Sequence, residues 1–294
     1  MTAQSVHSSG DADGTDLSLP GLDGLQLAAT AYGSRNASPV VLMGGMGQTR
    51  HAWSRAARQI AASGRRAITL DYRGHGDSDW SDRGDYTLPT LGREIVMAVS
   101  SLGRPVVLVG ASLGGKIALQ AAGTGGPDLA CALVMVDTAP RTEPAGVAAV
   151  TQILKPPKDG FESPDAAAAE LARIRGVPVA PNAGARLIRN MRRDASGRWR
   201  WHWDPAYSSQ DQGNGFPACV PLLEASAAQV RVPALLTRGE LSPVVGDAGV
   251  EALRALIPRL EVEVIPGASH MIVGDQNDLF ADALLRFLAR TPGL

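Results

Sequence analysis

Residues 106–114 read VVLVGASLG, so four apolar residues run directly into a serine with small neighbours. The apolar run predicts a buried β-strand, and the apolar spacing of residues 113–122 predicts a helix. Ser112 thus stands in a strand–turn–helix context, where small neighbours permit a strained turn that holds the hydroxyl clear of the sheet. The N–H of Leu113 would lie at the helix N-terminus, where it can stabilise an oxyanion. This GxSxG pattern indicates a nucleophilic serine; the alternative is a tight packing turn with an incidental serine.

The rest of the chain continues this alternation of strands and helices. Apolar β-rich runs recur at intervals of roughly 20 to 40 residues, which is typical of βαβ units around a parallel sheet. The predicted strands are residues 17–19, 25–32, 40–43, 67–70, 106–109, 132–136, 234–237 and 260–265, the first two forming an edge hairpin with Asp23-Gly24 in its turn. The predicted core helices are residues 51–63, 91–102, 113–122, 250–256 and 278–289. We therefore expect an α/β fold with a mostly parallel eight-stranded sheet and flanking helices.

One connection is far longer than the others, because roughly 90 residues separate the sixth and seventh predicted strands. Within it, residues 163–174 and 183–193 have helical patterns, and residues 197–205 have the pattern of a compact turn or strand. We interpret residues 140–231 as an inserted helical cap over the carboxyl edge of the sheet, where ligands bind in open α/β folds. Residues 17–139 and 232–294 would then form the core, and the polar residues 1–16 a disordered tail.

The composition argues against several other classes of protein. Lys and Arg number 28 and Asp and Glu 29, so no basic field attracts nucleic acid. No apolar run approaches the ~18 residues of a membrane span, and residues 1–16 lack a signal-peptide core, so we expect a cytoplasmic protein without a membrane partner. Cys131 and Cys219 lie outside any metal-binding spacing, which predicts two free thiols, no metal and no cofactor. The oligomeric state cannot be read from these patterns.

Four segments together resemble the α/β-hydrolase superfamily. They are residues 42–47 (LMGGMG), 71–78 (DYRGHGDS), 110–114 (GASLG) and 267–271 (GASHM). The resemblance covers nearly the whole chain and implies a serine hydrolase. In such proteins the loop after the third strand usually reads His-Gly-x, and the backbone N–H of x, here Met46, is the second oxyanion donor. Gly44 replaces the usual histidine, which removes a side chain that often braces this loop.

His270 is the candidate general base. It follows the last predicted strand, which is where the resemblance places the base. A serine hydroxyl is a weak nucleophile at neutral pH, so a histidine within hydrogen-bond reach must accept its proton and later return it to the leaving group. His75 fits better as a structural loop residue, and Asp71 as a loop-fixing residue that could pair with Arg73. His202 has no assigned role.

The position of the catalytic acid departs from the common pattern. Close relatives usually read Arg-Gly-x-x-Ser-Asp after the seventh strand, whereas residues 238–243 read RGELSP. Pro243 therefore stands where the aspartate is expected. Some members of the superfamily supply the acid from the end of the preceding strand, and Asp137 is the residue of this chain at that position.

Asp137 is our prediction for the acid, since it preserves the chain order serine, acid, histidine. A carboxylate holds the imidazole in the right tautomer and stabilises the imidazolium. We expect the Asp137 carboxylate within ~3 Å of one ring nitrogen of His270, with the other nitrogen facing the Ser112 hydroxyl. Glu240, Asp247 or the absence of a working acid are the open alternatives.

Arginines and tryptophans are frequent in the predicted cap. Six arginines lie near only one acid, namely Arg186, Arg189, Arg192, Arg193, Arg198 and Arg200. Such a stretch could attract an anionic substrate, although it is more often a solvated helix face. On a helix Arg186, Arg189 and Arg193 would share one side. Trp203 in the cap, Trp53 after the oxyanion loop and Trp80 after the Arg-Gly-His-Gly turn are the candidates for contact with substrate.

Three functions are compatible with these residues. The leading hypothesis is hydrolysis of an ester, lactone or thioester of a small to medium apolar molecule through an acyl-Ser112 intermediate, with His270 moving the proton. A non-hydrolytic or C–C bond reaction on the same scaffold is the second, because a fold does not fix its chemistry. The third is a catalytically inactive ligand-binding homologue in which Pro243 marks a lost acid.

Overall fold

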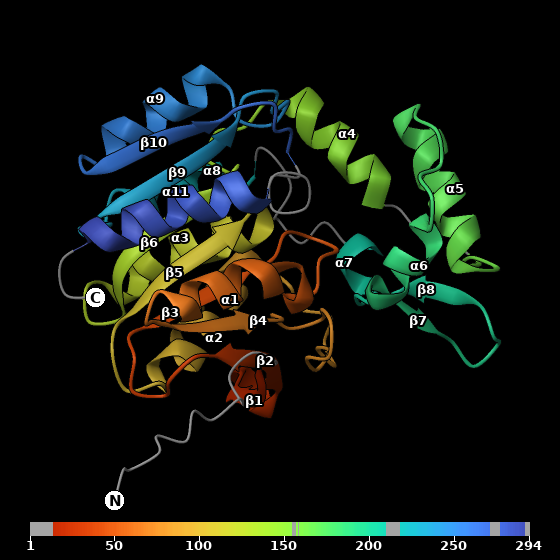
Figure 1. Ribbon diagram of the computed structural model, residues 1–294, viewed down its shortest axis with the longest axis horizontal. Coiled ribbons are helices and arrows are strands. Elements are labelled where there is room, and N and C mark those ends of the chain that lie inside the picture. Colours follow the sequence, from red (N-terminus) through yellow and green to blue (C-terminus); the bar gives the residue numbers. More distant parts are fainter. Residues whose placement is uncertain (1–13, 155–156, 158, 210–217, 271–276, 292–294) are drawn as a thin grey trace, which may run out of the picture.

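The chain folds around one large β-sheet (Figure 1). A computed structural model describes residues 14–154, 157, 159–209, 218–270 and 277–291. The strands of the sheet are β1 (Thr15–Pro20), β2 (Gln26–Tyr32), β3 (Pro39–Met43), β4 (Arg66–Leu70), β5 (Val106–Ala111), β6 (Ala130–Val136), β9 (Ala234–Gly239) and β10 (Leu260–Ile265). In this part of the chain they lie in the order β1-β2-β4-β3-β5-β6-β9-β10, and all pairs except β1·β2 and β2·β4 are parallel. The predicted mostly parallel eight-stranded sheet is confirmed.

The edge hairpin forms as predicted. In the connection between β1 and β2, Asp23 has φ 58° and Gly24 has φ 81°, which is the left-handed conformation that Asp and Gly tolerate best. Strand β1 begins at Thr15, so the last two residues of the predicted tail belong to the sheet. Residues 1–13 of that tail lie outside the described residues.

Helices cover both faces of the sheet because its strands are apolar on both sides. Along β3, for example, Val41 packs in one core, whereas Val40 and Leu42 pack in the other. The helices are α1 (Ser54–Ala62), α2 (Leu88–Ser100), α3 (Leu113–Gly125), α8 (Val220–Ala227), α9 (Asp247–Leu256) and α11 (Asn277–Arg290). Side chains of α2, α3, α8 and α9 join the first core, and those of α1 and α11 join the second.

Helix α8 changes the predicted boundary of the cap. The predicted cap of residues 140–231 contains this helix, but its Leu223 and Ala227 are buried in the main core. The helix packs closely on α3, where a Cβ on Gly123 would lie 2.4 Å from the carbonyl oxygen of Ser226. The end of the inserted segment therefore belongs to the core layer.

The cap contains helices and a small hairpin. Its elements are α4 (Pro144–Leu154), α5 (Pro164–Arg175), α6 (Ala183–Leu187), η3 (Ile188–Asn190), β7 (Met191–Arg193), β8 (Trp199–Trp201) and α7 (Ala206–Ser209). The predicted helix over residues 183–193 is wrong beyond Leu187, because residues 191–193 pair with β8 as an antiparallel strand. Arg193 therefore does not share a helical face with Arg186 and Arg189. A satellite core of Phe161, Ala167, Met191, Trp201 and Trp203 holds the cap together.

Both cysteines are free thiols, as predicted, with Cys131 on β6 and Cys219 just before α8. Across the residues that the structure describes, no helix combines the length and apolar character that crossing a membrane requires. The same residues contain no group of three or more His, Cys, Asp or Glu arranged to hold a metal ion.

Candidate active site

Ser112 occupies the turn between β5 and α3. Its backbone has φ 48° and ψ −114°, a strained conformation of the kind that functional sites often hold. Glycines make the turn possible, since a Cβ on Gly110 would lie 2.2 Å from the carbonyl oxygen of Gly114. A Cβ on Gly114 would in turn lie 2.4 Å from the carbonyl oxygen of Gly44. Close backbone approach therefore requires the small residues of the GxSxG motif, and Ser112 reaches a cavity above them.

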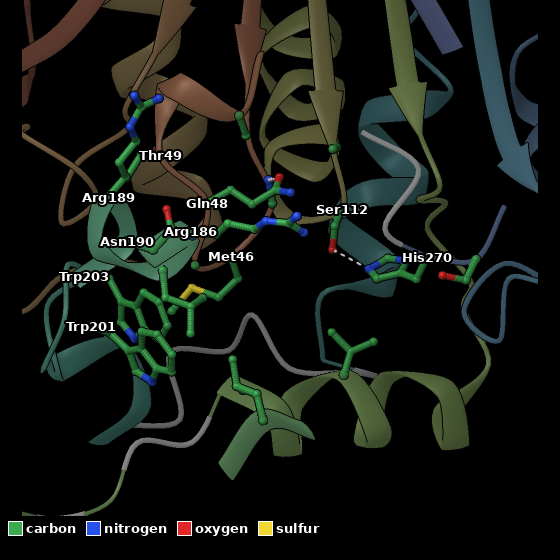
Figure 2. Close-up of a pocket in the computed structure, with 18 of the residues that line it drawn as sticks. Met46, Gln48, Thr49, Ser112, Arg186, Arg189, Asn190, Trp201, Trp203 and His270 are labelled. Carbon is green, nitrogen blue, oxygen red and sulfur yellow. Dashed lines mark hydrogen bonds between the residues drawn. The ribbon is translucent and has the colours of Figure 1, made fainter. Parts of the chain in front are cut away.

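His270 links Ser112 to Asp137, and Figure 2 shows its hydrogen bond to Ser112. Its Nε2 lies 3.2 Å from the Ser112 Oγ, and its Nδ1 lies 2.7 Å from the Asp137 Oδ2. When Nδ1–H is donated to the carboxylate, Nε2 is left as the acceptor for the serine proton. The carboxylate contact lies within the ~3 Å expected from the sequence, and the other ring nitrogen faces the Ser112 hydroxyl as expected.

Asp137 follows β6 directly and has a left-handed backbone, with φ 48°. Its side chain is 1% exposed and accepts two hydrogen bonds besides that of His270. The N–H of Gly239 donates to Oδ1 at 3.0 Å, and the hydroxyl of Ser242 donates to Oδ2 at 2.6 Å. These donors come from the end of β9 and the following loop, so the loop that lacks the usual aspartate instead supports the carboxylate at the end of β6.

The two rival acids are engaged elsewhere. Glu240 accepts the N–H of Gly267 at 2.8 Å, and Asp247 pairs with Arg238 at the start of α9. Pro243, which occupies the usual aspartate position, lines the cavity. Asp137 is therefore the carboxylate that contacts His270 among the described residues.

The two candidate oxyanion donors are Met46 and Leu113. Leu113 is the first residue of α3, and the loop that carries Met46 lies against the nucleophile turn, because a Cβ on Gly45 would be 3.2 Å from the Ser112 Cβ. The N–H of Gly45 donates to Gln48 Oε1 at 2.8 Å, which fixes the loop. Neither the Met46 nor the Leu113 N–H donates a hydrogen bond to another described residue, so both can serve an oxyanion.

Two buried histidines hold this loop. His75 Nε2 accepts the N–H of Gly47 at 3.3 Å, and His202 Nε2 lies 3.2 Å from the carbonyl oxygen of Gly47. His202 Nδ1 accepts the N–H of Gly76 at 2.7 Å, so the His202 proton must lie on Nε2 and is donated to Gly47. Both polar groups of the residue next to Met46 are thus fixed. The histidines supply the bracing that the loop lacks at its own usual histidine position.

The pKa of His202 makes this bracing dependent on pH. Burial lowers the pKa of His202 from its ordinary 6.5 to about 4, so the unfolded chain binds the proton more readily than the folded chain. The contribution of His202 to stability is complete above the ordinary pKa and is lost as the pH falls toward the folded pKa. Glutamine keeps a donor and an acceptor but does not titrate. As the pH falls from 7 to 4, we expect wild type to lose roughly 3 kcal/mol more unfolding free energy than His202→Gln.

Urea unfolding at several pH values measures this difference. His75, whose pKa is also held well below its usual value by burial, is present in both proteins and largely cancels. A difference that stays constant across this pH range would contradict the prediction.

The cavity beside Ser112 has a volume of about 750 Å³ and is bounded by both core and cap. Its apolar walls include Val136, Ala149, Val150, Leu171, Leu187 and Pro243. Trp201 and Trp203, whose rings stack at 5.3 Å, form the cap side (Figure 2). Such a space suits a small or medium apolar acyl group.

Two of the three predicted substrate-contacting tryptophans lie outside this cavity. Trp53 is fully buried and packs edge-on against Phe280, with ring centroids 5.6 Å apart. Trp80 is 38% exposed on the surface, where the Arg192 guanidinium lies 5.7 Å from its ring centroid. The predictions for Trp53 and Trp80 are therefore wrong, whereas Trp203 does line the cavity.

The loop of residues 71–78 uses a different pairing from the one expected. Asp71 binds Arg50, with Oδ2 2.6 Å from Nη1, and Arg73 binds Glu94 in a fully buried ion pair at 2.6 Å. Asp71 is thus a loop-fixing residue, as predicted, but Arg73 is not its partner. The roles of Gln48 and Ser242 were not predicted from the sequence, because both residues act through loop contacts that no local pattern encodes.

Known proteins share this architecture. Residues 38–276 match the family model for the alpha/beta hydrolase fold. The sn-1-specific diacylglycerol lipase ABHD11 of Mus musculus is 30% identical over 256 residues, which cover 85% of this chain and 80% of that protein. The structure of E-2-(acetamidomethylene)succinate hydrolase matches with a TM-score of 0.78 and 25% identity, covering 94% of this chain and 100% of that one. The thioesterase domain from the curacin biosynthetic pathway shares the fold, with a TM-score of 0.74, 22% identity and coverage of 92% and 99%.

Proposed function

Because the chain belongs to the α/β-hydrolase family and is a serine hydrolase, we propose that it cleaves an ester, lactone or thioester through an acyl-Ser112 intermediate. The observation that carries the proposal is the continuous path of hydrogen bonds from Ser112 through His270 to Asp137. Its geometry matches the requirement that a base touch the nucleophile while a carboxylate orients the base.

The reaction proceeds in two halves. His270 Nε2 accepts the proton of Ser112 as Oγ attacks the acyl carbon, and the N–H groups of Met46 and Leu113 stabilise the oxyanion. His270 then gives this proton to the leaving group, which departs and leaves the acyl group on Ser112. Water attacks the acyl-enzyme with His270 again as base, which releases the acid and restores the serine hydroxyl. Asp137 stabilises the imidazolium in both halves.

The substrate is a small molecule with an apolar body. The walls of the cavity are mostly apolar, and two stacked tryptophans close its cap side. The mouse relative is a lipase, and the curacin domain is a thioesterase. Both names describe hydrolysis of an acyl bond, which supports acyl transfer to water over the non-hydrolytic alternative. The complete hydrogen-bond path likewise favours an enzyme over an inactive ligand-binding homologue.

A fluorophosphonate probe followed by peptide mass spectrometry tests the proposal. We expect one phosphonate per chain, attached to Ser112, because His270 activates this serine. Prior incubation with a hydrolysable p-nitrophenyl ester should slow the labelling. Absence of labelling, or labelling of a different serine, would count against the mechanism.

A further inference from the structure

The cavity holds positive charge without matching negative charge. Arg186 and Arg189 line it from the cap side. Among the described residues of its wall none is acidic, and neither arginine has a described carboxylate oxygen within 4.0 Å. An apolar substrate that displaced water from a guanidinium would leave its donors without acceptors, which is unfavourable.

Other arginines of the cap have described hydrogen-bond or ion-pair partners. Those whose ion pairs the structure describes outside the cavity are Arg173 with Glu170 at 2.7 Å, Arg192 with Asp77 at 4.0 Å, Arg198 with Glu162 at 3.5 Å and Arg200 with Asp194 at 2.5 Å. Arg193 donates to the carbonyl oxygen of Gly197 at 3.1 Å. Arg186 and Arg189 thus differ from these five cap arginines, each of which has a described carboxylate or backbone carbonyl partner.

The two cavity arginines point in different directions. In Figure 2 the Arg186 side chain extends across the cavity toward Ser112, whereas Arg189 extends away from Ser112. Gln48, which also lines the cavity, accepts the N–H of Gly45 at Oε1 and keeps its NH₂ as a donor. Arg186 therefore presents donors alone to the cavity, and Gln48 adds the donor of its NH₂ to the same wall.

The position of Arg186 also indicates which part of a substrate it would meet. His270 must protonate the leaving group, so the leaving group lies on the His270 side of Ser112. Figure 2 shows Arg186 on the opposite side of Ser112 from His270. The acyl part of the substrate would extend toward Arg186.

We propose that Arg186 binds a carboxylate on the acyl part of the substrate. The inference rests on the proposed ester hydrolysis and narrows its substrate class to monoesters or monothioesters of small dicarboxylic acids. One planar guanidinium matches one carboxylate in charge and in its paired hydrogen bonds. The apolar walls then contact the methylene chain between the carboxylate and the scissile bond.

Two esters of equal acyl length test the proposal: p-nitrophenyl hydrogen glutarate, which carries a free carboxylate, and its neutral methyl ester. We expect wild type to hydrolyse the anionic ester with a kcat/KM about 10- to 100-fold above that of the neutral ester. In Arg186→Gln this ratio should fall to near one. Arg186→Lys should retain part of the preference, because it keeps the charge but loses the fork of donors.

Arg193→Gln is the matched control, since it removes a cap arginine outside the cavity and should leave the ratio at the wild-type value. A wild-type ratio at or below one, or a ratio that Arg186→Gln leaves unchanged, would overturn the carboxylate site. If neither ester is hydrolysed, the proposed function fails. The affinity of the anionic ester then tests the carboxylate site independently of hydrolysis. Tryptophan fluorescence should then show the anionic ester binding Ser112→Ala about 10- to 100-fold more tightly than Ser112→Ala/Arg186→Gln, and equal affinities would overturn it.

Discussion

Ser112→Ala is expected to lower kcat for p-nitrophenyl ester hydrolysis by about a millionfold. Without Oγ no acyl-enzyme can form, and His270 loses the hydroxyl that lies 3.2 Å from its Nε2. The remaining rate would come from substrate binding and from the oxyanion donors, which the substitution leaves in place. Release of p-nitrophenol measures the loss, and urea unfolding measures whether stability is retained.

Ser100→Ala is a suitable control because Ser100 lies on the exposed side of α2, with its hydroxyl donated to the carbonyl oxygen of Val96. It should show wild-type turnover. If Ser112→Ala stays within tenfold of wild type, Ser112 is not the nucleophile and the acyl-enzyme mechanism fails.

Asp137→Asn is expected to produce the second largest loss, about 10⁴-fold in kcat. The amide oxygen can replace Oδ1 as the acceptor for the Gly239 N–H, which lies 3.0 Å away. The amide NH₂ then faces His270 Nδ1, so the imidazole proton moves to Nε2. With Nε2 protonated, the imidazole can no longer accept the proton of Ser112. The effect is on the tautomer of the base, and the fold should remain intact.

Substitutions around the acid separate it from its rivals. Ser242→Ala removes one hydrogen bond to the Asp137 carboxylate and should cost about tenfold in kcat. Glu240→Gln and Asp247→Asn should keep nearly full activity, because neither side chain contacts His270. Full activity in Asp137→Asn together with loss in Glu240→Gln would assign the acid to Glu240 instead.

The local pattern of apolar residues was sufficient to predict the strands of the sheet. Each strand is an apolar β-rich run bounded by turn residues, and burial on both faces leaves little choice of conformation for runs such as residues 106–109 and 132–136. The serine turn was predictable for a related reason, because Gly110 is required by a contact within the turn itself, where a Cβ would lie 2.2 Å from the carbonyl oxygen of Gly114. Asp137 could be inferred from its place at a strand end, as Pro243 cannot supply a carboxylate.

The errors occurred where distant segments decide the outcome. Residues 183–193 have a helical apolar spacing, but the pairing of residues 191–193 with Trp199–Trp201 overrides it. Trp53 follows the oxyanion loop in sequence, yet Phe280 in the C-terminal helix covers its ring. His202 showed no signal at all, because its partners Gly47 and Gly76 lie far away in the chain.

The contacts of His202 limit how freely the cap could be exchanged by protein engineering. A cap grafted from another hydrolase without a histidine at this place would leave the N–H of Gly76 and the carbonyl oxygen of Gly47 facing it without partners. Each such buried group costs about 1–3 kcal/mol, and the loop that carries Met46 would lose one of its supports. Chimeras that alter substrate selectivity should therefore retain the hairpin of β7 and β8 through His202, and take their new sequence from α4 and α5.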